Sequence, residues 1–171
     1  TTQLEQPIPV ALRGLEIARA AGTVTILNTA PAASLDDAIF KLCDYVTPNE
    51  SEATGITGVA VTDVESARKA GDVLLAKGAG AALITLGGQG ALLHCKAKSV
   101  HIPIFNVGKV VDTTGAGDAF NGGFAAALAR GEEPETAARF GSAVAGISVT
   151  RPGTAPSMPM LAETMALLGK G

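Results

Sequence analysis

The sequence has few aromatic residues and a small net charge, and both features exclude classes of partner. Its 171 residues include five Phe, one Tyr and no Trp, too few for a platform on which single-stranded nucleic acid stacks. Thirteen basic against sixteen acidic residues leave a net charge of −3, which argues against binding along a phosphate backbone. Because 47% of the residues are hydrophobic and 17% charged, the chain is not intrinsically disordered. We expect one globular domain with no nucleic-acid partner.

Cysteines and uninterrupted apolar runs are scarce as well. The two cysteines, Cys43 and Cys95, are better explained by free, buried and inert thiols than by a disulfide framework, with a single pairing as the alternative. The longest uncharged stretch, residues 79–95, contains four glycines and a histidine, so it is too interrupted to span a membrane. The N-terminus lacks the basic segment and apolar run of a signal peptide. We expect a cytoplasmic protein with no membrane partner.

Short apolar runs alternate with amphipathic segments along the first two thirds of the sequence. Helices are expected over 10–21, 34–42 and 62–78, and strands over 24–27, 45–47, 81–86 and 91–95. Ser34 with Asp37, and Thr62 with Glu65, have the spacing of capping boxes at two of the helix starts. This alternation predicts an α/β fold with a doubly wound, mostly parallel sheet in a three-layer αβα arrangement.

The last third of the sequence has a helical pattern. Phe120, Phe124 and Leu128 recur every four residues and predict one core-facing stripe. Pro134 suits the first turn of a second helix, whose expected core residues are Phe140, Val144 and Ile147. A break over 151–157, rich in Pro and Gly, precedes a final helix that is expected to end near residue 168.

The segment Asp112-Thr113-Thr114-Gly115-Ala116-Gly117-Asp118 lies directly before the Phe120 helix. Small residues at a helix N-terminus let backbone N–H groups converge on an anion, and the helix dipole favours negative charge there. A carboxylate at Asp118 beside such an anion hole suits phosphoryl transfer to an alcohol, with the carboxylate as the base. The alternative is a glycine-rich loop followed by a helix-capping aspartate.

Two weaker motifs follow strand ends, and two common nucleotide motifs are missing. The turn over 85–90 and the pair Asn49 and Glu52 fall where ligands bind in doubly wound folds. Asn49 and Glu52 suit hydrated Mg²⁺. The alternatives are an ordinary hairpin turn and a capped helix start. Neither G-x-x-x-x-G-K-[ST] nor G-x-G-x-x-G after the first strand occurs. His94 and His101 lack a nearby third ligand, so no metal site is expected there.

Together these motifs resemble the C-terminal part of the ribokinase-like (PfkB) carbohydrate kinases. The family's second signature is matched over 112–122, and its N-x-x-E motif is matched by Asn49 and Glu52. Further similarity, strongest to members that phosphorylate ribose, lies at 3–5, 28–32, 47–50, 85–87 and 149–151, with Gly153 and Ser157. The resemblance covers residues 1–171 as the nucleotide-binding and catalytic part, with the N-terminal sugar-binding and lid part absent.

The resemblance implies a role for each matching residue. Asp118 matches the catalytic base, and Gly115, Ala116 and Gly117 match the anion hole. The residues implied to contact ATP are Asn49, Thr85, Leu86, Gly87, Gly88, Gln89, Gly90, Gly117, Asp118 and Ser142. Those implied to hold a monovalent cation, usually K⁺, are Asp112, Thr114, Ser148, Arg151, Gly153 and Ser157. Glu52 is implied to organise Mg²⁺ through water, and Glu5 and Asp118 to contact the sugar.

The implied activity is ATP-dependent phosphorylation of a sugar primary hydroxyl, with D-ribose giving D-ribose 5-phosphate, in a protein that forms a homodimer when its lid is present. The alternatives are another sugar or nucleoside kinase of the family, such as a fructokinase, and a truncated ATP-binding module without catalysis. Thr29 replaces a common proline and Ala119 a common threonine, and neither is expected to touch the chemistry. Ser142 stands where the family often has His or Asn near the adenine.

Overall fold

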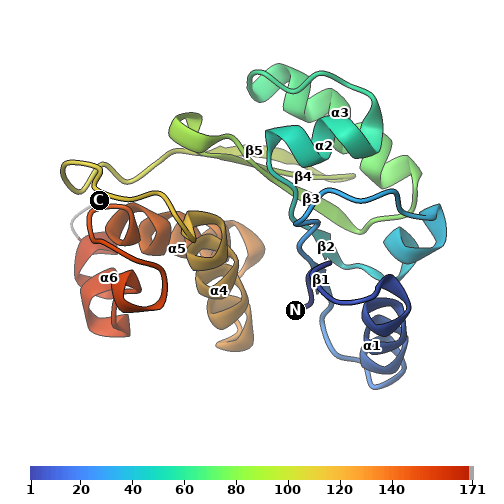
Figure 1. The fold of residues 1–171 in the computed structure, drawn as a ribbon, viewed down its shortest axis with the longest axis horizontal. Coiled ribbons are helices and arrows are strands. Elements are labelled where there is room, and N and C mark those ends of the chain that lie inside the picture. The colour runs from blue at the N-terminus through green and yellow to red at the C-terminus, as the bar shows by residue number, and fades with distance from the viewer. Residues whose placement is uncertain (170–171) are drawn as a thin grey trace. The chain divides into compact units, whose positions relative to one another are not determined.

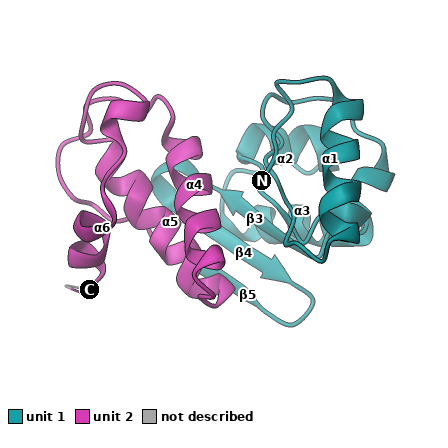
Figure 2. Ribbon diagram, turned by 90° about the horizontal axis from the view of Figure 1, so that it is seen from below, with its two compact units in different colours: residues 1–101 teal, residues 102–171 magenta. Residues whose placement is uncertain are grey.

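The structure, a computed structural model, describes residues 1–169 and divides the chain into two compact units (Figures 1 and 2). The first unit comprises Thr1–His101 and the second begins at Ile102. The first contains helices α1 (Ile8–Ala20), α2 (Glu50–Thr57) and α3 (Val64–Ala76), the 3₁₀ helices η1 (Asp37–Leu42) and η2 (Gly87–Gln89), and strands β1 (Ile26–Leu27), β2 (Tyr45–Val46), β3 (Ala81–Thr85), β4 (Ala91–Cys95) and β5 (Ser99–Ile102), whose last residue belongs to the second unit.

The five strands form one mixed sheet in the order β1-β2-β3-β4-β5. Strand β2 is parallel to both β1 and β3, whereas β4 is antiparallel to β3, with Ala81 opposite Cys95 and Thr85 opposite Ala91. Helices α2 and α3 pack side by side, and α3 contacts β3 and β4 (Figure 1). The predicted α/β class is therefore confirmed. The parallel strands also bring the carboxyl ends of β1, β2 and β3 to one edge of the sheet.

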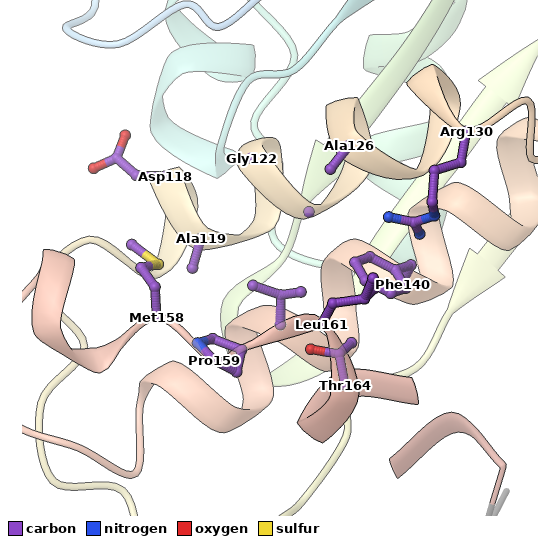
Figure 3. A pocket seen from close by; sticks show the side chains of 12 residues that line it. Asp118, Ala119, Gly122, Ala126, Arg130, Phe140, Met158, Pro159, Leu161 and Thr164 are labelled. Carbon is purple, nitrogen blue, oxygen red and sulfur yellow. The ribbon is translucent and has the colours of Figure 1, made fainter. Parts of the chain in front are cut away.

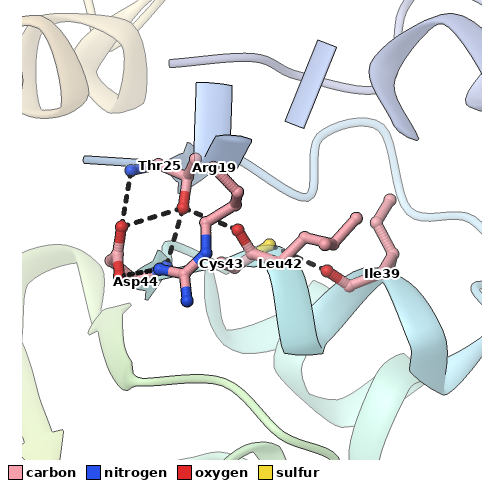
Figure 4. Close-up of polar contacts among 6 residues, drawn as sticks. All are labelled: Arg19, Thr25, Ile39, Leu42, Cys43 and Asp44. Carbon is pink, nitrogen blue, oxygen red and sulfur yellow. Dashed lines mark hydrogen bonds and ion pairs between the residues drawn. The ribbon is translucent and has the colours of Figure 1, made fainter. Parts of the chain in front are cut away.

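A polar network ties α1 to the starts of the first two strands (Figure 4). Arg19 Nη1 donates to Asp44 Oδ1 at 2.5 Å, and the backbone N–H of Thr25 donates to Asp44 Oδ2 at 2.8 Å. The Thr25 hydroxyl in turn donates to the carbonyl of Leu42 at 2.6 Å. Strand β1 begins at Ile26 rather than at the expected residue 24.

The two cysteines are free, but their surroundings differ. Cys43 is buried beside this network, and its Sγ donates to the carbonyl of Ile39 at 3.1 Å (Figure 4). Burial, assisted by the neighbouring charge of Asp44, raises the pKa of the Cys43 thiol to about 12. Cys95 is only half-buried. The expected burial is therefore confirmed for Cys43 and wrong for Cys95.

Two of the expected helix caps are wrong by one or two residues. Residues 37–42 form the 3₁₀ helix η1, which is capped by the carboxylate of Asp36 and not by Ser34. Helix α3 is capped by Asp63, whose carboxylate accepts from the N–H of Ser66 at 2.7 Å while Ser66 Oγ accepts from the N–H of Asp63 at 3.0 Å. Asp63 therefore takes the position expected of Thr62, because its carboxylate forms the reciprocal pair of hydrogen bonds.

The second unit is helical, with α4 (Ala116–Ala129), α5 (Pro134–Ser148), the 3₁₀ helix η3 (Ala155–Ser157) and α6 (Leu161–Leu168). Helix α5 packs against both α4 and α6. The expected stripe is buried on α5, where Phe140, Val144 and Ile147 are 3–8% exposed. On α4, Phe120 and Phe124 are buried. Within residues 1–169, no helix combines the length and apolar character that crossing a membrane requires.

Candidate active site

The residues of the predicted anion hole lie at the N-terminus of α4. Gly115 is the N-cap residue, and its φ of 75° favours glycine; a Cβ there would also lie close to Thr154 Cγ2, at 3.2 Å. The N–H of Ala116 donates to the carbonyl of Thr113 at 3.1 Å. Among the described residues, the N–H groups of Gly117 and Asp118 form no hydrogen bond. They are the donors that a helix N-terminus offers to an anion.

Asp118 lies in the first turn of α4, as the sequence predicts, and its side chain is exposed. It stands at one end of a cavity of about 300 Å³, which the sequence analysis did not predict (Figure 3). The helix face over this cavity repeats every four residues as Asp118, Gly122, Ala126 and Arg130. The small residues Gly122 and Ala126, four positions apart on this face, are the sequence signal from which the cavity could have been predicted. The remaining walls are Ala119, Gly123, Phe140, Val144, Met158, Pro159, Leu161 and Thr164.

Asp112 joins two loops that were expected to hold a monovalent cation. Its Oδ1 accepts from the N–H of Thr114 at 2.9 Å, and its Oδ2 accepts from the N–H of Gly153 at 3.0 Å. These bonds, those from Thr114 foremost, lower the pKa of Asp112. The carbonyl of Val149 accepts from the N–H groups of Val111 at 2.8 Å and Asp112 at 3.2 Å. The carboxylate that precedes α4 is thus held, ionised, against the segment that follows α5.

Four of the other expected cation residues lie at the end of α5 or after it: Ser148 is the last residue of α5, and Arg151, Gly153 and Ser157 follow. Ser148 and Ser157 are buried, and the carbonyl of Ser148 accepts from the N–H of Arg151 at 3.0 Å. The guanidinium of Arg151 pairs with Glu163 in α6, and this hydrogen bond is the main reason why the pKa of Glu163 is lowered. The six expected residues therefore lie in the segment before α4 and around the end of α5, and Asp112 connects the two through Gly153. Their carboxylate, hydroxyl and carbonyl oxygens are the hard ligands that fit such a cation.

Ser142, the expected adenine contact, is buried in α5. Its hydroxyl donates to the carbonyl of Pro103 at 2.8 Å. This hydrogen bond joins α5 to the segment that precedes α4, so the side chain has a structural partner, while its oxygen retains acceptor capacity.

In the first unit, Asn49 and Glu52 form the cap of α2 at the carboxyl edge of the sheet. Glu52 is 6% exposed. Its Oε2 accepts from the N–H of Asn49 at 3.0 Å, and its Oε1 accepts from Asn49 Nδ2 at 2.9 Å. The capped helix start and the predicted ligand pair are therefore the same feature. Oε1 carries one hydrogen bond and keeps lone-pair capacity, which fits a water-mediated contact with Mg²⁺.

One further contact of this pair was not expected from the sequence. Thr29 was expected to lie outside the chemistry, but its hydroxyl donates to Glu52 Oε2 at 2.9 Å. Thr29 follows β1 and Glu52 lies in the first turn of α2. The contact joins residues 23 positions apart, so no local pattern in the sequence could predict it.

The turn over residues 85–90 lies beside this pair. The N–H of Thr85 donates to the carbonyl of Pro48 at 3.0 Å, immediately before Asn49. Gly87 and Gly88 are exposed, and a Cβ on Gly87 would lie 3.4 Å from Glu50 Oε1. The expected nucleotide-binding turn and the N-x-x-E motif therefore share one edge of the sheet.

Glu5 reaches the same edge through the N-terminal segment. Thr2 bridges to Leu27 in parallel, and the N–H of Leu4 donates to the carbonyl of Ala30 at 2.8 Å. The carboxylate of Glu5 follows next in the chain and is exposed.

Neither histidine lies in a metal cluster. His94 Nε2 is 3.0 Å from Asp72 Oδ1, and His101 Nε2 is 2.6 Å from the carbonyl of Gln89. The described part of the chain contains no group of three His, Cys, Asp or Glu side chains that could hold a metal ion. The loops expected to hold a monovalent cation, and Glu52, offer oxygen atoms and no histidine or cysteine.

Comparison with known proteins agrees with this geometry. A family model described as pfkB family carbohydrate kinase matches residues 3–161. Ribokinase from Haemophilus influenzae is 45% identical over 166 residues, 97% of this chain and 54% of that protein. The deoxyribokinase of Salmonella typhi is 36% identical over 162 residues, 94% of this chain and 53% of that protein. The chain thus spans about half the length of the curated relatives it matches.

Solved structures show the same relationship. A structure of Arabidopsis thaliana ribokinase complexed with ribose and ATP superposes with a TM-score of 0.93 at 30% identity, covering 97% of this chain and 54% of that one. Ribokinase from Thermotoga maritima superposes with a TM-score of 0.86 at 40% identity, covering 98% of this chain and 55% of that one.

Proposed function

This chain belongs to the pfkB family of carbohydrate kinases, and we propose that it is the nucleotide-binding and catalytic part of an enzyme that transfers the γ-phosphoryl group of ATP to the primary hydroxyl of a sugar. D-Ribose, giving D-ribose 5-phosphate, is the proposed acceptor. The relatives named ribokinase and the structure complexed with ribose and ATP support this choice. The single observation that carries the proposal is the exposed carboxylate of Asp118 beside N–H groups at the start of α4 that donate to no other residue among 1–169.

Asp118 is proposed as the general base. Its carboxylate takes the proton of the acceptor hydroxyl, the resulting oxygen forms a bond to the γ-phosphorus of ATP, and the bond from that phosphorus to the bridging oxygen of ADP breaks. The N–H groups of Gly117 and Asp118, with the small residues Gly115 and Ala116 leaving room, stabilise the negative charge on the transferred group. The helix dipole of α4 adds to this stabilisation.

The remaining predicted residues are proposed to bind and orient the substrates. The turn over 85–90, with Asn49, would hold the nucleotide, Ser142 would lie at the adenine, and Glu5 would contact the sugar. Glu52 would hold Mg²⁺ through water, and the ion would neutralise charge on the nucleotide phosphates. The two loops joined by Asp112 would hold K⁺. We further propose a cytoplasmic location and a homodimer for the enzyme that contains the family's lid.

The test compares Asp118→Asn with Glu65→Gln in the protein as the cell makes it. Both residues are exposed carboxylates in the first turn of a helix, α4 and α3 respectively. We expect Asp118→Asn to lower ribose-dependent turnover by about 10²- to 10⁴-fold with ATP affinity preserved, whereas Glu65→Gln leaves both unchanged. Near-normal turnover of Asp118→Asn would refute the assignment of the base.

A panel of acceptors separates the alternatives within the family. Ribose, deoxyribose, fructose and adenosine are compared by kcat/KM with the same enzyme. A clear preference for fructose or adenosine would overturn ribose as the acceptor and keep the kinase. ATP binding without phosphoryl transfer to any of the four would favour a nucleotide-binding module that lacks catalysis.

A further inference from the structure

The carboxylate of Glu52 is buried and is held by three hydrogen bonds. Oε2 accepts from the hydroxyl of Thr29 at 2.9 Å and from the N–H of Asn49 at 3.0 Å. Among residues 1–169, Oε1 accepts from Asn49 Nδ2 alone, at 2.9 Å. Thr29 is fully buried and Glu52 is 6% exposed. A buried charge depends on every such partner, because water does not replace one that is lost.

The three bonds leave different hydrogen-bonding capacity on the two carboxylate oxygens of Glu52 and on the side-chain amide of Asn49. Oε2 has two donors and is fixed in position, whereas Oε1 has one donor and a free lone pair. The side-chain oxygen of Asn49 accepts from the N–H of Glu52 at 2.9 Å and from Ser51 Oγ at 2.8 Å. The second hydrogen on Asn49 Nδ2 and the free lone pair on Glu52 Oε1 therefore remain for a ligand at the sheet edge.

Only one of the three donors comes from outside the cap of α2. Asn49 is the N-cap residue of that helix, so its two bonds to Glu52 are local. Thr29 stands two residues after β1, where the N–H of Ala30 donates to Asn28 Oδ1 at 3.0 Å and gives the loop a defined turn. A β-branched side chain is stiff about its first torsion. The Thr29 hydroxyl thus fixes the carboxylate relative to the sheet.

We propose that Thr29 is a positioning residue of the nucleotide-binding edge: its hydroxyl fixes the carboxylate of Glu52, and through it the amide of Asn49, so that their free polar atoms meet a hydrated magnesium–nucleotide. The inference rests on the proposed function for its ligand. It also makes Mg²⁺-dependent nucleotide binding in this chain depend on residue 29, where the family commonly has a proline that offers no hydroxyl.

The first experiment tests the positioning without any ligand. A double-mutant cycle, measured by urea unfolding, combines Thr29→Val with Glu52→Gln. Thr57→Val serves as the control, because the Thr57 hydroxyl donates to the backbone carbonyl of Ala53 in the same helix. We expect Thr29→Val to lower the folding equilibrium constant about tenfold when Glu52 is unaltered and less than about threefold in the Glu52→Gln background, where the buried charge is gone. Thr29→Ser should restore most of the loss. Equal effects in the two backgrounds would overturn the proposal.

The second experiment measures ATP affinity by calorimetry in Mg²⁺ and in EDTA. We expect Thr29→Val to reduce the gain in affinity that Mg²⁺ provides about tenfold, whereas Thr57→Val and Thr29→Ser keep it. A purely structural role would weaken binding equally in both buffers, and that result would overturn the proposal. If Mg²⁺ does not raise the ATP affinity of the unaltered chain, the magnesium role fails for both the proposed function and this inference. A coupling between Thr29 and Glu52 in the double-mutant cycle would then show only that Thr29 shapes the N-terminal cap of α2.

Discussion

Gly141 and Gly122 provide a matched test of the helix packing that supports Asp118. A Cβ at Gly141, inside α5, would lie 2.7 Å from the carbonyl oxygen of Phe120 and 3.3 Å from the N of Phe124, both backbone atoms of α4. A Cβ at Gly122, inside α4, would meet nothing within 4 Å. Each Gly→Ala change gains the same intrinsic helix propensity, about 1 kcal/mol. The two variants therefore differ in the steric clash alone.

The size of the clash follows from the distances. Ordinary contacts of a Cβ begin at 3.4 Å, so the methyl group of Gly141→Ala is about 0.7 Å too close to an atom that cannot rotate away. Overpacking of this kind costs about 1–3 kcal/mol. We expect Gly122→Ala to raise the free energy of unfolding by about 1 kcal/mol, and Gly141→Ala to lower it by up to about 2 kcal/mol.

Urea unfolding followed by far-UV circular dichroism measures this difference. With a slope of about 1–3 kcal/mol per molar, the two midpoints should lie on the order of 1 M apart, with Gly141→Ala the lower. Hydrogen exchange at the N–H of Ala119, which donates to the carbonyl of Gly115, should quicken in Gly141→Ala alone, because opening the helix pair loosens the segment that carries Asp118. If Gly141→Ala is as stable as Gly122→Ala, the close α4–α5 contact does not exist.

Three further predictions concern ionisable and cation-binding groups. The folded pKa of Asp112 is lowered by its bonds from Thr114 and Gly153, so these bonds stabilise the fold above about pH 4. The stabilisation is lost as the pH falls through the folded pKa. Asp112→Asn should therefore make the urea midpoint depend less on pH below about pH 4, and an unchanged dependence would contradict the contact. Since the pKa of Cys43 is raised to about 12, iodoacetamide at pH 8 should spare Cys43 until urea unfolds the chain, and equal rates in the two states would exclude the buried thiol. Kinase activity should be higher in K⁺ than in tetramethylammonium buffer, and equal activity would remove the cation site from the proposal.

The features that sequence patterns predicted well are local ones. Phe140, Val144 and Ile147 lie on one side of α5 because helical geometry places residues three and four apart together, whatever surrounds them. The helix caps were harder, since Asp36 and Asp63 stand beside or near the residues first expected to cap. Spacing alone cannot choose between neighbouring polar side chains, because the choice depends on which one completes its hydrogen bonds in the folded loop.

The scarcity of charge and aromatics, the place of Asp118 in a first helical turn and the match to the family signature were determined by the sequence itself, since each depends on composition or on residues within a few positions. Only the tertiary structure decided that Thr29 holds Glu52 and that Asp112 holds Gly153, across 23 and 41 positions. It also decided that the small residues of α4 line a cavity. Such contacts arise when strand ends and helix ends meet in space, and no local pattern of residues reveals which of them will meet.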